Sequence, residues 1–283
     1  MLNKLKTFIL MLGLMGVLML IGNLVGGRQG MIIAFVFAAL MNFFSYWHSD
    51  KIVLKLYRAE PASRGENPEL FRIVEDLASR ANIPVPGVYI LPQNTPNAFA
   101  TGRNPSHAAV AVTRGIISIL NRNELEGVIA HELSHVKNRD ILVSTVAATM
   151  AGAIMLLASM ARWAAILGGG RSSRNRGGAG MIGLLLAAII APLAAMLIQM
   201  AISRSREYLA DRDGAEISGN PQHLAEALRK LQMHAGRGMQ GANEATAHMF
   251  IVHPLKSSGL SGLFSTHPDT EERIRRLQNI RPG

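Results

Sequence analysis

The chain has 283 residues, of which 49% are hydrophobic and only 5% aromatic, and it carries a formal net charge of +10. An apolar surplus of aliphatic residues, glycine and methionine is typical of helices that face lipid or pack closely together. The absence of cysteine excludes a disulfide framework, a cysteine nucleophile and a thiolate metal site. Nucleic acid is not expected as a partner, because the basic residues are scattered and no aromatic-rich basic stripe accompanies them.

Two apolar runs, residues 8–25 and 31–47, open the chain and predict a transmembrane hairpin. The first run lacks the small-x-small cleavage site of a removable signal peptide, so we expect it to remain as an anchor. Lysines precede the first run and basic residues follow the second, whereas the turn between them holds only Arg28. This distribution predicts that both ends of the hairpin lie in the cytoplasm.

Short strands are predicted next, at Val88–Leu91, Ala98–Thr101 and Ala108–Thr113, because these segments are separated by Pro, Asn and Gly turns. Proteases often bind an extended peptide along an exposed strand edge through main-chain hydrogen bonds. We predict that the edge is formed by Asn97, Ala98, Phe99, Ala100 and Thr101. The Asn97 side chain is also a candidate donor to a substrate carbonyl, although turn formation beside Pro96 is the favoured reason for an asparagine there.

The most informative motif is His131-Glu132-Leu133-Ser134-His135. Apolar residues at spacings of three and four around it predict a helix, with Asn123 as its N-cap. Two histidines four residues apart on a helix point the same way and can bind one zinc ion. Glu132, between them, is then placed to handle a proton.

Two further apolar runs without charges, residues 141–161 and 181–203, follow the motif. The loop between them holds several arginines and no acid, which an exported loop should not. Either small-residue packing inserts the pair across the membrane, or the pair dips into the bilayer or packs beneath the catalytic domain. We therefore predict a transmembrane hairpin at 1–50 and a catalytic domain at 51–283 that is interrupted by these two runs.

A catalytic zinc keeps three protein ligands and one open position, so a third ligand is required. The metzincin pattern is excluded, because its further Gly and His positions hold Asn138 and Ile141. The remaining common ligand is a carboxylate from a second helix, and Glu207 and Asp211 share one helical face. One of the two can bind the metal while the other orients a zinc-bound histidine.

These motifs resemble the HtpX family of membrane zinc metalloproteases, gluzincins related to the CAAX prenyl proteases. The resemblance covers nearly the whole chain and is carried by the hairpin, Asn97–Gly102, Glu124–Gly127, Asn138–Asp140, Glu207–Asp211 and Thr266–Pro268. It implies that His131, His135 and Glu207 bind one Zn²⁺ per chain, that Glu132 is the general base, and that Asp211 orients a ligand. The implied fold is α+β and mainly α: a multi-pass membrane protein whose zincin-like domain contains a small sheet and an active-site helix.

A donor that stabilises the transition state is also expected, because one metal contact seldom serves both oxygens of a gem-diolate. The candidate is His267, which precedes Pro268 and a helix whose Asp269 and Glu272 have capping-box spacing. His253 also precedes a proline and is the competing choice.

The resemblance implies a stress-response endopeptidase of the bacterial inner membrane, with its catalytic domain in the cytoplasm. Its expected partners are the lipid bilayer and membrane-protein or unfolded polypeptide substrates, chiefly misfolded or damaged ones, in quality control. Two other readings remain open. One is a processing protease with a single dedicated substrate, and the other is a membrane scaffold that only retains a structural zinc.

Overall fold

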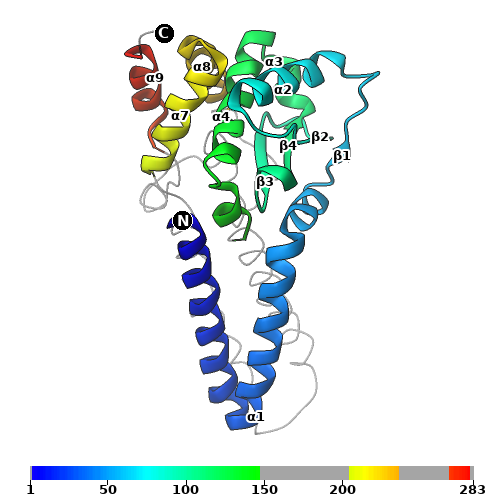
Figure 1. Ribbon diagram of the computed structural model, residues 1–283, viewed down its shortest axis with the longest axis vertical. Helices are drawn as coiled ribbons and strands as arrows, with labels where there is room; N and C mark the ends of the chain where they lie inside the picture. The colour runs from blue at the N-terminus through cyan, green and yellow to red at the C-terminus, as the bar shows by residue number, and fades with distance from the viewer. Residues whose placement is uncertain (1, 147–203, 236–267, 281–283) are drawn as a thin grey trace, which may run out of the picture.

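The computed structural model describes residues 2–146, 204–235 and 268–280 (Figure 1). His267, His253 and most of the second pair of apolar runs lie outside these residues. Helix α1, Leu2–Leu56, folds back on itself at Gly27, whose φ is +58°. Its two antiparallel arms are joined by a hydrogen bond from Asn42 Nδ2 to the Met11 carbonyl, 3.1 Å long. The predicted hairpin is thus present in the fold, while its crossing of a membrane stays a prediction.

The second arm of α1 has the length and composition of a membrane span. Gly27–His48 has a mean hydropathy of 1.7, whereas the apolar segment of the first arm, Thr7–Leu20, is shorter. Apart from Val85, Leu209 and Met233, all large hydrophobic side chains exposed on the described residues lie on α1. A continuous exposed apolar surface of this kind marks contact with lipid or another apolar partner.

A four-stranded sheet in the order β1-β2-β4-β3 follows the hairpin and forms the centre of the rest of the described fold. Its strands are β1 (Glu60–Pro61), β2 (Gly87–Leu91), β3 (Ala98–Gly102) and β4 (Ala108–Thr113), with the short 3₁₀ helix η1 (Pro105–His107) before β4. Strands β2 and β4 are parallel, and the other two pairs are antiparallel. The three predicted strands are confirmed, and β3 lies at an edge as expected.

The two faces of the sheet have different covers, because side chains alternate along each strand. Val110 and Val112 of β4 point into the main core, which α2 (Pro68–Ala81) and α4 (Arg122–Lys137) complete. Ala109 and Ala111 point to the opposite face, where they meet the last turns of α1. The sheet is therefore packed directly against the helix that leaves the hairpin.

Of the three remaining helices after α4, the first two pack on α4 and the third packs on those two (Figure 1). They are α7 (Arg204–Ser218), α8 (Pro221–Ala235) and α9 (Thr270–Gln278), while α3 (Arg114–Ile119) follows β4. Helix α7 approaches α4 closely at Gly214, where an added Cβ would lie 2.9 Å from both the Cα and the N of His131. This close approach brings the preceding two turns of α7, which carry Glu207 and Asp211, against the motif helix.

Candidate active site

Helix α4 holds the motif in a buried position. It is capped by Asn121, whose side chain accepts from the Glu124 N–H while the Glu124 carboxylate accepts from the Asn121 N–H. The prediction of Asn123 as the cap is therefore wrong by two residues. Glu124 is 2% exposed and also accepts a hydrogen bond of 2.7 Å from Lys230 of α8. The cap and this ion pair fix the start of α4 against α8.

The three predicted metal ligands converge between α4 and α7. The Nε2 atoms of His131 and His135 lie 3.7 and 3.6 Å from the two carboxylate oxygens of Glu207. Their candidate ligand atoms all lie within 4.8 Å of one another. Glu207 comes from α7, about seventy residues further along the chain, so only the packing of α7 on α4 can bring it here.

A carboxylate holds the far side of the His131 ring. Asp211, one turn after Glu207, places Oδ1 3.0 Å from His131 Nδ1. Arg273 of α9 donates to both Asp211 oxygens, at 2.9 and 2.7 Å. Burial would raise the pKa of Asp211, but the Arg273 charge and hydrogen bonds outweigh it and lower that pKa to about 2. Asp211 is therefore an anion, as a carboxylate that orients a metal-binding histidine must be.

A second carboxylate holds His135 in the same way. Asp140 Oδ2 lies 3.4 Å from His135 Nδ1. Burial lowers the pKa of His135, but the hydrogen bond to Asp140 and the charge of Glu207 overcome this and raise it to about 9. With both Nδ1 atoms facing carboxylates, both Nε2 atoms are left for a shared ligand.

The Glu132 side chain reaches from α4 to the edge strand β3 of the sheet. Its Oε2 accepts a hydrogen bond of 2.9 Å from the Ala100 N–H of β3. Burial raises the pKa of the Glu132 carboxyl, and the charge of Glu207 adds to this rise. The charges of His131 and His135 lower the same pKa but do not outweigh the burial. A raised pKa suits a group that takes up and returns a proton near neutral pH.

The predicted substrate-binding segment is buried against this site, but its members face different ways. The Asn97 N–H donates to Thr113 Oγ1, and the Asn97 carbonyl accepts from the Thr113 N–H, both at 2.9 Å. Phe99 packs on Tyr57, which directly follows α1. The hydroxyls of Thr101 and Thr145 lie 3.2 Å apart. Ala98 and Ala100 are left to present main-chain groups at the outer edge, and a substrate role for the Asn97 side chain stays a prediction.

Arg206, which the sequence did not single out, adds positive charge beside the site. Its two terminal guanidinium nitrogens are buried and have no hydrogen-bond partner within the part of the chain that the structure describes. Burial lowers the pKa of Arg206, although the nearby carboxylates of Asp140 and Glu207 act against that effect. The Arg206 guanidinium, which lies near Glu207, is therefore a candidate hydrogen-bond donor to an anionic group bound at this site.

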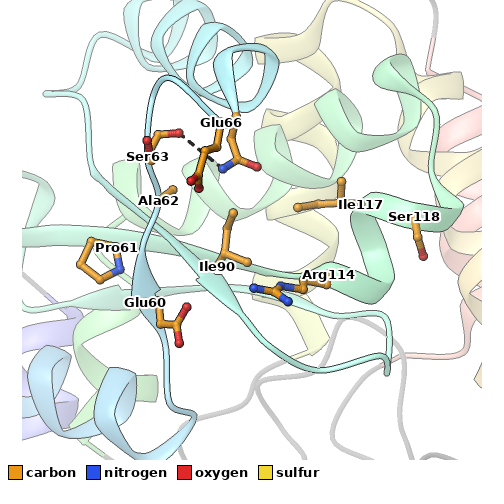
Figure 2. A pocket seen from close by; sticks show the side chains of 10 residues that line it. Glu60, Pro61, Ala62, Ser63, Glu66, Ile90, Arg114, Ile117 and Ser118 are labelled. Carbon is orange, nitrogen blue, oxygen red and sulfur yellow. Dashed lines mark hydrogen bonds between the residues drawn. The ribbon is translucent and has the colours of Figure 1, made fainter.

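A separate pocket of about 320 Å³ lies at the opposite edge of the sheet (Figure 2). Glu60, Glu66 and Arg114 contribute charged side chains to it, over a floor that includes Ile90 and Ile117. Strands β2 and β4 separate this pocket from β3. It is therefore distinct from the His and Glu cluster.

The donor set fits a zinc ion. Two imidazole nitrogens and one carboxylate are ligand types of catalytic zinc, and tetrahedral bonds of about 2.1 Å place ligand atoms roughly 3.4 Å apart. The observed separations of 3.6 and 3.7 Å are close to that value. A helical histidine pair, a carboxylate from a second helix and a glutamate beside an edge strand define the site of a metal-dependent hydrolase.

Comparison with known proteins identifies the family. The model of peptidase family M48 matches residues 64–281. The chain is 58% identical over 277 residues to a protein named "Protease HtpX homolog" of Desulforapulum autotrophicum, covering 98% of this chain and 90% of that one. It is 57% identical to the protein of the same name from Thermococcus sibiricus, covering 98% and 95%. The chain therefore belongs to peptidase family M48, and within it to the HtpX group, so it is a peptidase.

A solved structure agrees with the fold. The crystal structure of S. mikatae Ste24p matches with a TM-score of 0.53 at 18% identity, covering 94% of this chain and 62% of that one. At this identity the likeness concerns the fold alone. It supports a fold that is mainly helical with a small mixed sheet, in line with the predicted class.

Proposed function

We propose that this chain is a zinc-dependent endopeptidase that works at a membrane surface. The observation that carries the proposal is the convergence of His131, His135 and Glu207 beside Glu132, with Glu132 hydrogen-bonded to an edge strand. A catalytic group and a peptide-binding edge in direct contact are what hydrolysis of an extended polypeptide requires.

The residues divide the chemistry among them. His131, His135 and Glu207 hold zinc, which when bound supplies Lewis acidity and a water of lowered pKa. Glu132 removes the proton of the attacking water and returns it to the leaving amine, a cycle that its raised pKa favours. Asp211 and Asp140 keep the two imidazoles oriented. His267 is proposed as the additional donor to the transition state.

The proposed location is supported by α1. Its exposed apolar surface and the span Gly27–His48 support insertion of the hairpin into a lipid bilayer. Basic residues at both ends of the hairpin favour a catalytic domain on the cytoplasmic face of a bacterial inner membrane. We propose membrane proteins, misfolded or damaged, as the substrates to be removed in quality control, and no nucleic-acid partner.

The direct test compares the intact chain with Glu132→Gln in detergent with added zinc. The intact chain should cleave an unfolded membrane-protein substrate, and Glu132→Gln should lose at least about 100-fold of this rate while retaining zinc. Equal cleavage by both proteins would remove the mechanism, whereas no cleavage by either would favour the scaffold reading. A zinc content unchanged in Glu207→Ala would remove the third ligand.

A further inference from the structure

The catalytic sheet is joined to the second arm of α1 without a flexible linker. Helix α1 continues to Leu56, and Val53 and Leu54 of its last turn, with Tyr57 directly after it, are buried against the sheet. Tyr57 contacts the ring of Phe99 on β3, with ring centroids 5.2 Å apart. The direction of β3 is therefore fixed relative to the arm that would cross the bilayer.

One end of β3 is fastened at the level where the apolar arm ends. Arg103, directly after β3, donates to the Trp47 carbonyl at 3.2 Å and stacks over the Trp47 ring at 4.8 Å. Trp47 is 46% exposed and continues an aromatic group with Phe43, Phe44 and Tyr46. Such aromatic groups lie at the boundary between hydrocarbon and headgroups. In a membrane-spanning hairpin, Arg103 would therefore lie at the bilayer surface.

The segment that follows the motif helix makes a second contact with the same end of β3. After Asp140 the chain continues as a helix whose Leu142, Val143 and Val146 pack against Leu14 of the first arm. Thr145 of this segment lies 3.4 Å from the Gly102 N–H, which donates to its hydroxyl. Both arms of the hairpin therefore hold the Gly102 end of β3.

The distance from this boundary to the general base is short. Arg103 lies three positions after Ala100, whose N–H donates to Glu132. At about 3.3 Å per residue this is a span on the order of 10 Å. A polypeptide leaving the bilayer reaches Glu132 within a few extended residues.

The outer edge of β3 determines which way a paired substrate strand would run. Asn97 pairs with Thr113 by a hydrogen bond, so the alternation of an antiparallel ladder turns the main-chain groups of Ala98 and Ala100 outward. Of these outward groups, the Ala100 N–H already donates to Glu132. An added strand pairs slightly better antiparallel than parallel. Since β3 runs toward the membrane, such a strand runs away from it.

We propose that this peptidase selects bonds that lie within about three to six extended residues on the C-terminal side of a transmembrane helix. The inference rests on the proposed function and deepens it. An antiparallel substrate enters with its N-terminal part at Arg103, so its membrane anchor precedes the cleaved bond. A segment that precedes its anchor would have to pair in the less favourable direction.

The test uses proteoliposomes that contain the intact chain with zinc and three single-span substrates with one cleavable cassette. The cassette follows the span directly, follows it after a flexible spacer of about 25 residues, or directly precedes it. We expect the first arrangement to be cleaved about tenfold faster than the other two, because tethering raises the local concentration of one geometry. Equal rates for all three would overturn the inference.

A soluble unfolded polypeptide with the same cassette separates the two levels of the proposal. If the intact chain cleaves it and Glu132→Gln does not, while the membrane substrates show no positional preference, only the inference fails. If no substrate is cleaved, the proposed function fails and the inference with it.

Arg103→Ala tests the fastening itself. It should retain cleavage of the soluble polypeptide while the preference among the membrane substrates falls toward one. The matched control is Arg64→Ala, which removes a comparable stacking contact with Phe71, 5.1 Å from its ring, on helix α2. A full positional preference in Arg103→Ala would overturn the role of this contact.

Discussion

Arg273 and Asp211, 62 residues apart in sequence, form a buried pair with two hydrogen bonds of 2.9 and 2.7 Å. The side chains of Arg273 and Asp211 are only 1% and 3% exposed. Because Asp211 also contacts His131, helix α9 acts on the metal cluster without touching it. The consequence is that a residue on the last described helix holds the carboxylate that orients a candidate metal ligand.

We predict that Arg273→Leu destabilises the protein by about 3–5 kcal/mol, because it leaves the Asp211 carboxylate buried and unpaired. Zinc affinity should also fall, since His131 loses an oriented partner. Denaturant unfolding and zinc titration would measure the two effects. Arg275→Leu is the control on the same helix, where an exposed arginine should change stability by no more than about 0.5 kcal/mol. Similar losses from both variants would refute the role of the pair.

Zinc binding should depend on pH through His135. Its pKa of about 9 in the metal-free protein means that a proton must leave before the imidazole can bind a metal. The apparent association constant should therefore fall about tenfold per pH unit as the pH drops below 9. Asp140→Asn removes the hydrogen bond that raises this pKa and should move the onset to lower pH. An unshifted onset in Asp140→Asn would count against the assignment.

The same groups make the stability of the metal-free protein depend on pH. The raised pKa of His135 gives a contribution that is complete below its ordinary value of 6.5 and is lost as the pH rises through about 9. The lowered pKa of Asp211 gives a contribution that is complete above its ordinary 3.8 and is lost as the pH falls through about 2. Unfolding free energies measured with a chelator across this range should therefore decline at both ends. A chelated protein that gains stability toward pH 9 would contradict the His135 part.

Gly214→Ala should weaken both folding and metal binding. The added methyl would lie 2.9 Å from backbone atoms of His131, which cannot rotate away, so α7 must shift. Overpacking of this kind costs about 1–3 kcal/mol, and the shift would carry Glu207 away from the histidines. Thermal unfolding with and without zinc would show it. Gly65→Ala, whose nearest neighbour is a side-chain oxygen at 3.8 Å, should be close to neutral, and equal effects would rule out the close-approach argument.

The cap of α4 can be tested against the position that the sequence favoured. Asn121→Ala should cost about 1 kcal/mol because it removes the side-chain acceptor of the capping box. Asn123→Ala, inside the helix, should have a much smaller effect. The midpoint of thermal unfolding distinguishes the two, and a larger loss from Asn123→Ala would mean that the helix begins later.

Local sequence patterns explain why the motif helix and the three short strands could be predicted. The spacing of His131 and His135 and the short strands around Pro, Asn and Gly are properties of neighbouring residues, so they could be read directly. The cap could not, because Asn121 and Asn123 each precede a glutamate by three residues. The choice depends on Lys230, which binds Glu124 from another helix. Likewise nothing near Arg273 indicates its partner, and β1 is too short to have a pattern.

If α1 spans a bilayer as proposed, its direct packing against the sheet predicts that cleavage depends on the lipid. A helix longer than the hydrocarbon layer tilts in a thinner bilayer, and this arm could not tilt alone because Val53 and Leu54 at its end are buried against the sheet. The β3 edge must rotate with it. Acyl-chain length should then change which peptide bond comes to rest beside Glu132, so that the thickness of the host membrane becomes part of the enzyme's specificity.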